Sequence, residues 1–398
     1  MKKMLMLSAL NLWSMGRGKG APSFYRTVTG YLDAGWAVTL IMPKDSPENF
    51  IQVKNLNIIE YRNGLFLKLF GIKKVGFVAR LIYAWYCTFL FYYLGIKEGR
   101  DADIIYAYEV NAVKAGKMLS QSFKVPLVTR FQGTILSQHK NTYINRLRFY
   151  PHYHALKTPA DITIMTDDGS LGDKVLEKLG NKSTYRFFWK NGVNIDYQSL
   201  TDDNSDGVRK QHGISSDEKI LLTVSRLVGW KRVDRAIIAM KCITESYPKC
   251  KLVIVGDGPE RENLEKLSNE LGLHDDVIFT GSVSHDKVST YMYAADVFLS
   301  LYDISNVGNP LLEAMLIGKA IVTLNVGDTK NLISHEKTGL LLSLEEIDKL
   351  PQKVIDLLRN PSKTSKLGEN AREFALQHFW TWEERIKREI IEVEKLLL

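Results

Sequence analysis

Cysteine is scarce in this sequence of 398 residues. Only Cys87, Cys242 and Cys250 occur, and their spacing fits neither a metal-binding motif nor a disulfide framework. So few cysteines are typical of a reducing compartment, and we expect a cytoplasmic protein. The apolar core of residues 1–10 is short for a signal peptide, and a glycine-rich loop follows it, which favours a first β-strand over a targeting segment.

Several binding signatures are also missing. The sequence holds no GK[ST] phosphate loop, and the glycines within residues 16–20 match the dinucleotide pattern GxGxxG only in part, which disfavours a dehydrogenase. It shows no signature of an RRM, KH or helix-turn-helix domain, so we expect no nucleic acid partner. Glycines on a first turn still let the backbone approach a phosphate, although a plain tight turn explains them almost as well.

The charge is spread unevenly. Residues 1–195 hold 27 Lys and Arg against 13 Asp and Glu, whereas the remainder holds 26 against 32. The length predicts two domains, and the asymmetry favours two bodies with different partners. A basic first half suggests an anionic membrane, a nucleic acid or a phosphorylated substrate. A basic surface that only serves solubility is the alternative.

Residues 62–96 combine aromatic and basic side chains. Residues 77–96 are almost wholly apolar with Arg80 as their only charge, and the segment before them mixes apolar side chains with lysines. The length just permits a transmembrane helix, but α/β units continue on both sides. We expect a helix partly buried in its domain, with the basic segment before it touching a membrane surface. A helix buried in the core is the alternative.

Strands and helices alternate along the chain. Apolar runs predict buried strands at residues 4–10, 37–42, 103–108, 126–131, 162–165, 219–224, 251–255, 277–281, 297–301 and 320–324. The polar segment 201–207 reads as a boundary between two halves. This alternation predicts an α/β fold with two doubly wound, Rossmann-like domains. Residues 380–398 form an amphipathic helix with no strand after it.

The segment 299–315 carries the strongest signal of a site. An apolar run ends at Leu301, a polar turn follows, and a helical pattern then contains a lone carboxylate, Glu313. The start of a helix after a parallel strand is where such sheets hold anionic ligands. Pro310 is expected at the first helical position, where its fixed φ fits. Free backbone N–H groups are predicted to face a sugar or phosphate; they belong to Val307, Gly308, Asn309 and Leu311.

These features together resemble the retaining glycosyltransferases of family 4, which have the GT-B fold of two Rossmann-like domains facing across a cleft. The motifs that carry the resemblance are Ser225-Arg226-Leu227 with Lys231, Gly256-Asp257-Gly258-Pro259, Thr280-Gly281, and residues 308–315. Residues 191–194 are similar to the family's NGVD sequence. The resemblance implies an acceptor-binding domain at 1–198, a nucleotide-sugar domain at 199–378, and a helix at 379–398 that packs back on the first domain.

The resemblance also implies the reaction. A UDP- or GDP-sugar donates its sugar, with retention and without a metal ion, to a lipid-linked or oligosaccharide acceptor in cell-surface polysaccharide or glycolipid synthesis. Arg226 and Lys231 match the pair that binds the diphosphate, and both suit that task chemically. Glu313 matches the ribose ligand. The other donor-binding residues implied are Gly18, Lys19, Gly20, Gly256, Gly258, Ser305, Asn306, Val307, Gly308, Asn309, Pro310 and Leu311.

Two positions depart from the family's pattern. Ser305 stands where the family has a first acid, and Gln132 stands where it often has a histidine near the reacting carbon. Gln132, Gly133 and Thr134 are the implied acceptor-binding residues, with Gln132 also catalytic, although a glutamine cannot act as a base. Retaining transfer is thought to need little protein base, because the leaving phosphate can take the acceptor's proton. The alternative is a catalytically degenerate GT-B protein that scaffolds a polysaccharide-assembly complex.

Overall fold

The computed structural model describes residues 1–10, 22–44, 53–62, 76–140 and 142–398. The predicted donor residues Gly18, Lys19 and Gly20, and the basic segment at 63–75, lie outside this range. The chain divides into two units, which are described separately. The N-terminal unit holds the described residues up to Gly192 together with Thr381–Leu398, and the C-terminal unit holds Val193–Trp380.

The N-terminal unit is built on a seven-stranded parallel sheet with the order β3-β2-β1-β4-β5-β6-β7. Its strands are β1 (Lys3–Ser8), β2 (Ala37–Pro43), β3 (Leu56–Tyr61), β4 (Ile104–Tyr108), β5 (Leu127–Phe131), β6 (Ile162–Thr166) and β7 (Tyr185–Trp189). The central strands are continuous buried runs, because helices cover both faces of the sheet. The strand order reverses between β1 and β4, and such a switch point is where open sheets bind ligands.

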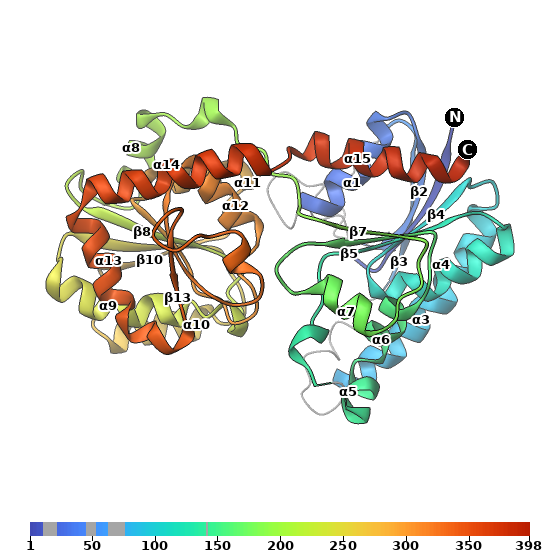
Figure 1. Ribbon diagram of the computed structural model, residues 1–398, viewed down its shortest axis with the longest axis horizontal. Helices are drawn as coiled ribbons and strands as arrows, with labels where there is room; N and C mark the ends of the chain where they lie inside the picture. The colour runs from blue at the N-terminus through green and yellow to red at the C-terminus, as the bar shows by residue number, and fades with distance from the viewer. Residues whose placement is uncertain (11–21, 45–52, 63–75, 141) are drawn as a thin grey trace. The chain divides into compact units, whose positions relative to one another are not determined.

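Two layers of helices sandwich this sheet (Figure 1). One layer holds α3 (Gly76–Glu98), α4 (Val110–Phe123), α6 (Tyr150–Lys157) and α7 (Gly172–Lys178). The other holds α1 (Pro22–Asp33) and, from the far end of the sequence, α15 (Trp382–Glu394). A Cβ added at Gly30 of α1 would lie 2.3 Å from a methyl carbon of Ile386, so the absence of a side chain there lets the two helices pack closely.

A buried ion-pair network also anchors α15. Glu389 is fully buried, and its carboxylate accepts hydrogen bonds from Arg130 at 2.8 Å, Arg385 at 2.9 Å and the Tyr106 hydroxyl at 2.6 Å. Burial opposes ionisation of Glu389, but the two guanidinium groups outweigh it and hold the pKa of Glu389 below its usual value. Arg130 lies on β5, so the network ties α15 to the central part of the sheet.

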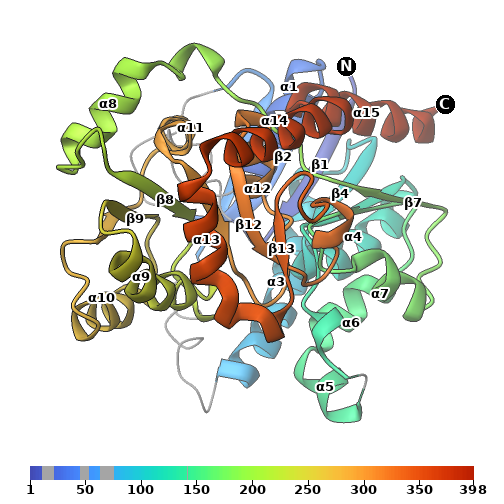
Figure 2. The same cartoon turned by 60° about the vertical axis from the view of Figure 1, so that its left-hand side comes forward.

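The C-terminal unit repeats the architecture with six parallel strands in the order β10-β9-β8-β11-β12-β13. They are β8 (Lys219–Val224), β9 (Cys250–Val255), β10 (Val277–Gly281), β11 (Val297–Ser300), β12 (Ala320–Leu324) and β13 (Leu340–Leu342). One face is covered by α9 (Asp234–Ser246), α10 (Arg261–Glu270) and α13 (Leu350–Arg359). Figure 2 shows α8 (Asp202–Gln211), α11 (His285–Ala294), α12 (Asn309–Ile317) and α14 (Pro361–His378) at the other face.

The prediction of a boundary between the two halves at the polar segment 201–207 is wrong. This segment is the start of helix α8 and not a loop between domains. Thr201 caps the helix by accepting a hydrogen bond from the backbone N–H of Asn204. Asp202 and Asp203 then occupy the first turn, where negative charge favours a helix. The first unit ends earlier, at Gly192. A Cβ there would lie 2.5 Å from the backbone of Trp382, so only glycine permits this approach.

Helix α3 is half buried, as predicted for residues 77–96. Tyr83, Cys87 and Phe91 pack into the core, whereas Trp85 and Phe89 face outward with exposed fractions of 57% and 74%. Within the described residues we find no helix with the length and apolar character needed to cross a bilayer.

Candidate functional site

The carboxyl edge of the C-terminal sheet gathers most of the predicted donor-binding residues. β8 and β11 are neighbours at the point where the strand order reverses. Arg226 lies just after β8, and Lys231 lies in the short helical turn Gly229–Lys231 that follows it. The predicted turn 301–308 follows β11 and leads into α12, which carries Glu313. Neighbouring strands at a switch point therefore bring these segments to one edge.

Two aromatic rings hold the ammonium group of Lys231. Its Nζ lies 4.1 Å from the ring centroid of Trp230 and 3.7 Å from that of Tyr302. Both distances fall within the range of a cation–π interaction. The two rings meet edge to face, and the buried Tyr302 hydroxyl donates to the carbonyl oxygen of Val224 at 2.9 Å. Tyr302, in the loop after β11, thus positions the ammonium group of Lys231, which lies in the loop after β8.

Asp303 ties the same two loops together. Its backbone N–H donates to the carbonyl oxygen of Trp230 at 3.0 Å. Its carboxylate lies 2.6 Å from Arg235 and 3.4 Å from Arg232. Arg235 also donates to the carbonyl oxygen of Leu301 at 2.7 Å. Asp303 therefore acts as a link between loops rather than in place of the acid missing at 305.

The glycines of the Gly256–Gly258 motif are required by loop packing. A Cβ on Gly256, whose φ is +135°, would lie 1.9 Å from the carbonyl oxygen of Ser225. A Cβ on Gly258 would lie 2.4 Å from that of Leu227. The backbone of Ser225 and Leu227, on either side of Arg226, therefore packs directly against this motif. The guanidinium of Arg226 is exposed, and within the part of the chain that the structure describes it makes no ion pair. These glycines therefore shape the turn that presents Arg226.

Asn306 has a structural task. Its side chain is fully buried, and its Oδ1 accepts hydrogen bonds from the Ser300 hydroxyl at 2.8 Å and the Tyr302 backbone N–H at 3.0 Å. Its Nδ2 donates to the carbonyl oxygen of Leu324 at 3.2 Å. The amide therefore fixes the shape of the turn after β11 from inside.

The prediction of free backbone N–H groups in this turn is wrong for Val307, Gly308 and Leu311. The N–H of Val307 donates to the Ser305 hydroxyl at 3.1 Å. The N–H of Gly308 donates to the carbonyl oxygen of Asn306 at 2.8 Å, and that of Leu311 to the carbonyl oxygen of Gly308 at 3.0 Å. The turn is tight enough to satisfy its own donors, so a ligand would have to meet side chains or displace these bonds.

Glu313 lies buried within α12 and pairs with a histidine that the sequence reasoning missed. The Nε2 of His285 lies 3.3 Å from a carboxylate oxygen of Glu313, and His285 itself is about half exposed. His285 is the first residue of α11, soon after β10, so its place after a strand was a signal available in the sequence. Helix α12 begins at Asn309, which makes Pro310 its second residue and not its first.

At the carboxyl edge of the N-terminal sheet, the loop after β5 lies against two carboxyl groups that were not predicted. The backbone N–H of Gln132 donates to Glu109 at 2.6 Å, and its side-chain amide donates to the Tyr108 hydroxyl. A Cβ on Gly133, whose φ is +120°, would lie 2.0 Å from a carboxylate oxygen of Asp168. Burial raises the pKa of Glu109 to about 7 and that of Asp168 to about 6.

Glu109 also has an unusual backbone, with φ of 71° at the residue before α4. Strained conformations of this kind cost about 1–3 kcal/mol and cluster at functional sites. Thr134, by contrast, is structural: it is buried, its N–H donates to the Ser170 hydroxyl at 2.9 Å, and its hydroxyl accepts from the N–H of Leu136. The chemistry offered by this edge therefore lies in Glu109 and Asp168 rather than in Thr134.

The described ranges contain no group of three or more His, Cys, Asp or Glu side chains placed to hold a metal ion.

Comparison with known proteins finds a family model that matches the second half of the chain. Residues 204–374 match the family model described as "Glycosyl transferases group 1". A GDP-mannose-dependent alpha-(1-6)-phosphatidylinositol monomannoside mannosyltransferase of Mycobacterium tuberculosis is 30% identical over 183 residues, which are 44% of this chain and 47% of the relative. The chain thus matches about half the length of that curated relative.

Two solved structures share the whole architecture. Sucrose-phosphate synthase from Thermosynechococcus elongatus has a TM-score of 0.77 at 21% identity, covering 100% of this chain and 99% of its own. HepE from Anabaena, in complex with UDP and glucose, has a TM-score of 0.73 at 21% identity and covers 99% and 100%. At these identities the likeness concerns the fold. Residues 204–374 thus match the group 1 glycosyl transferase model, and the chain as a whole has the GT-B fold.

Proposed function

We propose that the C-terminal unit binds a UDP- or GDP-sugar at the edge formed by the loops after β8 and β11. Lys231 and Arg226 contact the diphosphate, and Glu313 accepts hydrogen bonds from the ribose. The observation that carries this proposal is the placement of Lys231, whose ammonium is held by Tyr302 from the loop that leads to Glu313. A cation held in one position loses little conformational freedom when it meets a phosphate.

We further propose that the chain transfers the sugar to a lipid-linked or oligosaccharide acceptor with retention at the anomeric carbon. The bond from the anomeric carbon to the diphosphate breaks, the bond to the acceptor oxygen forms on the same face, and the leaving phosphate takes the acceptor's proton. Lys231 and Arg226 neutralise the charge that develops on the diphosphate, so the step needs no metal ion. In the loop after β5, Gln132 and Gly133 contribute to acceptor binding.

The names of similar proteins support the choice of substrates. The mycobacterial relative is named for GDP-mannose and for a phosphatidylinositol monomannoside. HepE was solved with UDP and glucose. A nucleoside diphosphate sugar and a glycolipid acceptor are therefore the first substrates to try with this chain.

A thermal-shift screen with UDP, GDP, ADP and TDP tests the donor site, because a ligand that binds only the folded state raises the melting temperature. We expect UDP or GDP to raise it. The same nucleotide should bind Lys231→Ala at least about 30-fold more weakly, since truncating a charged contact costs about 2–5 kcal/mol. Lys266→Ala is the matched control, because Lys266 is an exposed lysine on α10 of the same unit. Equal nucleotide affinity in the two variants would show that Lys231 does not contact the nucleotide.

The second candidate is a binding or scaffold protein of the same fold. Ser305 in place of an acid favours it, as does Gln132, whose side-chain amide is engaged by Tyr108. Turnover assays with a panel of UDP- and GDP-sugars separate the two. Nucleotide binding without sugar transfer and without donor hydrolysis would support the scaffold, whereas either reaction supports the enzyme.

A further inference from the structure

One side of helix α3 exposes a row of large apolar residues. Their spacing of three or four residues places them on a single helix face. They are Val78, Ile82, Trp85, Phe89 and Tyr93, each about half exposed or more. The buried residues Tyr83, Cys87 and Phe91 alternate with them, so the helix is already anchored by its other side. An apolar row that the unit does not use for its own core is available for an external partner.

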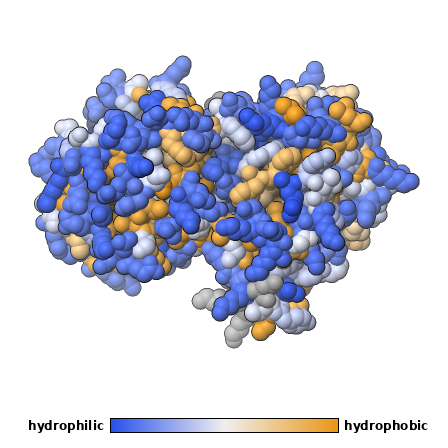
Figure 3. Space-filling model, viewed as in Figure 1, coloured by the Kyte–Doolittle hydropathy of each residue, from blue (hydrophilic) through white to orange (hydrophobic). Residues whose placement is uncertain are grey.

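The short helix α5 (Tyr143–Arg148) adds a second exposed apolar group. Tyr143 and Ile144 are 76% and 74% exposed, and Leu147 is about half exposed. Figures 1 and 2 both place α5 at the end of the N-terminal unit where α3 begins, and Figure 3 shows hydrophobic surface at that tip. We call the exposed apolar residues of α3 and α5 together the α3–α5 face.

The sequence around this face contains no acidic residue over two long segments. Residues 76–97 hold two Lys and Arg, residues 110–160 hold seven besides the buried Arg130, and neither segment holds an Asp or Glu. These segments include α3, α4, α5 and α6. The face is therefore complementary in charge to an anionic surface. Two copies of it would repel each other, which disfavours a homodimer through this face.

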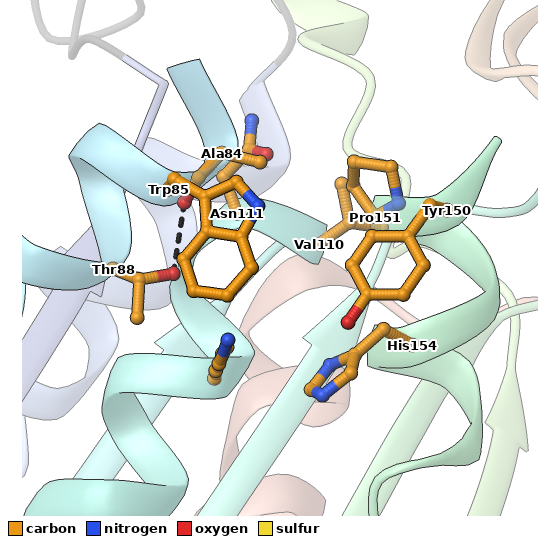
Figure 4. Close-up of a pocket in the computed structure, with 9 residues that line it drawn as sticks. Ala84, Trp85, Thr88, Val110, Asn111, Tyr150, Pro151 and His154 are labelled. Carbon is orange, nitrogen blue, oxygen red and sulfur yellow. Dashed lines mark hydrogen bonds between the residues drawn. The ribbon is translucent and has the colours of Figure 1, made fainter. Parts of the chain in front are cut away.

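A groove between α3, α4 and α6 opens beside the row. Figure 4 shows Trp85 on one wall and Tyr150 with His154 on the other. The Nζ of Lys114 lies 3.6 Å from the ring centroid of Trp85, and the amide of Asn111 also lines the groove. Burial, together with the charge of Lys114, lowers the pKa of His154, which disfavours a charged imidazole in the groove. One cation with neutral donors around it suits a singly charged phosphodiester.

We propose that the α3–α5 face docks on the surface of an anionic phospholipid bilayer, with its apolar side chains among the headgroups and Lys114 on a lipid phosphate in the groove. Aromatic and aliphatic side chains supply the apolar burial, and the surrounding Lys and Arg supply attraction to the charged lipids. This docking requires no sugar transfer, so it holds for an enzyme and for a scaffold alike.

Flotation with vesicles tests the proposal on the full chain. One set contains phosphatidylcholine alone, and the other contains roughly one-third phosphatidylglycerol, a composition that gives a negative surface potential. We expect binding to the second set and weak binding to the first. Absence of binding to phosphatidylglycerol vesicles at low salt, or equal binding to both sets, would overturn the proposal.

Two substitutions separate the apolar and the charged contributions. Phe89→Ser should weaken binding to phosphatidylglycerol vesicles about tenfold through lost apolar burial. Leu376→Ser is the control, because Leu376 is an exposed leucine on α14, and this change should leave vesicle binding unchanged.

Lys114→Gln should weaken binding to phosphatidylglycerol vesicles about fivefold, and should leave the weak binding to neutral vesicles unchanged. Lys366→Gln on α14 is the exposed control for charge. A Phe89→Ser variant that binds like wild type would refute the assignment of this face.

A fluorescence measurement tests the position of Trp85 with a conservative variant. Brominated lipids should quench tryptophan fluorescence, and the quenching should fall in Trp85→Phe, a substitution that keeps an aromatic ring. Unchanged quenching would overturn the placement of Trp85 in the headgroup layer. A wild-type dimer in solution that Phe89→Ser dissociates would show instead that a second protein copy covers the face. Nucleotide-induced thermal shifts report on the C-terminal unit separately.

Discussion

The two sheets share one strand pattern but present opposite chemistry at their carboxyl edges. The first half of the sequence is basic overall, yet its described edge presents the carboxyl groups of Glu109 and Asp168. The second half is acidic overall, yet its edge presents Arg226 and Lys231 with one buried carboxylate, Glu313. Net charge describes the solvated surface of each half, whereas a few loop residues decide what each edge can bind.

The two edges are also supported differently. In the C-terminal unit, loops that follow neighbouring strands hold each other through Tyr302, Asp303 and the glycines of 256–258. In the N-terminal unit, Arg130 of β5 pairs with Glu389 of α15, a helix from a distant part of the sequence. The following predictions test whether each support is specific to its own unit.

The largest effect is expected from Glu389→Ala. This change leaves Arg130 and Arg385 buried without their carboxylate, and removal of one partner from a buried ion pair costs about 3–5 kcal/mol. Thermal unfolding followed by calorimetry should show a lower transition for the N-terminal unit, while nucleotide binding to the C-terminal unit persists. Glu392→Ala on the same helix, whose partner Lys395 is exposed, should cost well under about 1 kcal/mol. Similar losses in both variants would contradict the buried network.

A smaller effect is expected from Gly256→Ala in the C-terminal unit. The new Cβ would meet the Ser225 carbonyl oxygen at a φ of +135°, and such strain costs about 1–3 kcal/mol. The turn carrying Arg226 should move, so nucleotide affinity should fall together with stability. Gly207→Ala is the control, because Gly207 lies on α8 with open space around it and alanine favours a helix. Calorimetry and nucleotide titration of both variants measure these two losses. An unchanged nucleotide affinity for Gly256→Ala would show that the Gly256–Gly258 motif does not shape the donor site.

The smallest effect concerns the charge of the N-terminal edge. The pKa of Glu109 is raised in the folded state to about 7, above its unfolded value, so the folded chain holds a proton that the unfolded chain releases. Stability should therefore fall as the pH rises through about 4.5 to 7. Glu109→Gln should remove that part of the slope, as measured by urea unfolding at a series of pH values.

Other groups contribute to the measured pH slope, so the difference between wild type and variant is the quantity to compare. Asp168 acts in the same direction as Glu109, because burial also raises its pKa. Glu389 acts in the opposite direction, because its pKa is lowered and its stabilisation is lost as the pH falls. An identical slope for wild type and Glu109→Gln would show that Glu109 is not held in its protonated form.

Local patterns in the sequence predicted much of the architecture. Apolar runs located nearly all of the central strands within a residue or two, because buried parallel strands are continuous hydrophobic segments. The family motifs placed Arg226, Lys231 and Glu313 on segments that the structure brings to one sheet edge. The polar run 201–207 was misread, although Thr201 followed by two aspartates is itself the start signal of a helix.

Features that depend on contacts distant in sequence could not be predicted. Nothing in the local sequence shows that the amide of Asn306 donates to the carbonyl oxygen of Leu324, or that the Ser305 hydroxyl accepts a hydrogen bond from the N–H of Val307. The raised pKa of Glu109 comes from burial, which only the folded chain defines. The pairing of His285 with Glu313 joins helices that follow different strands. These contacts determine which groups remain available to a ligand, and sequence patterns do not predict them.

The path of α15 has a consequence for biosynthesis. Arg130 is translated 259 residues before Glu389, the carboxylate that pairs with it. Until α15 has left the ribosome, the sheet face that it covers lacks this helix. The N-terminal unit therefore completes its fold only after the C-terminal unit has been synthesised, and a nascent chain stalled before Trp382 would expose the apolar side of α1 to chaperones.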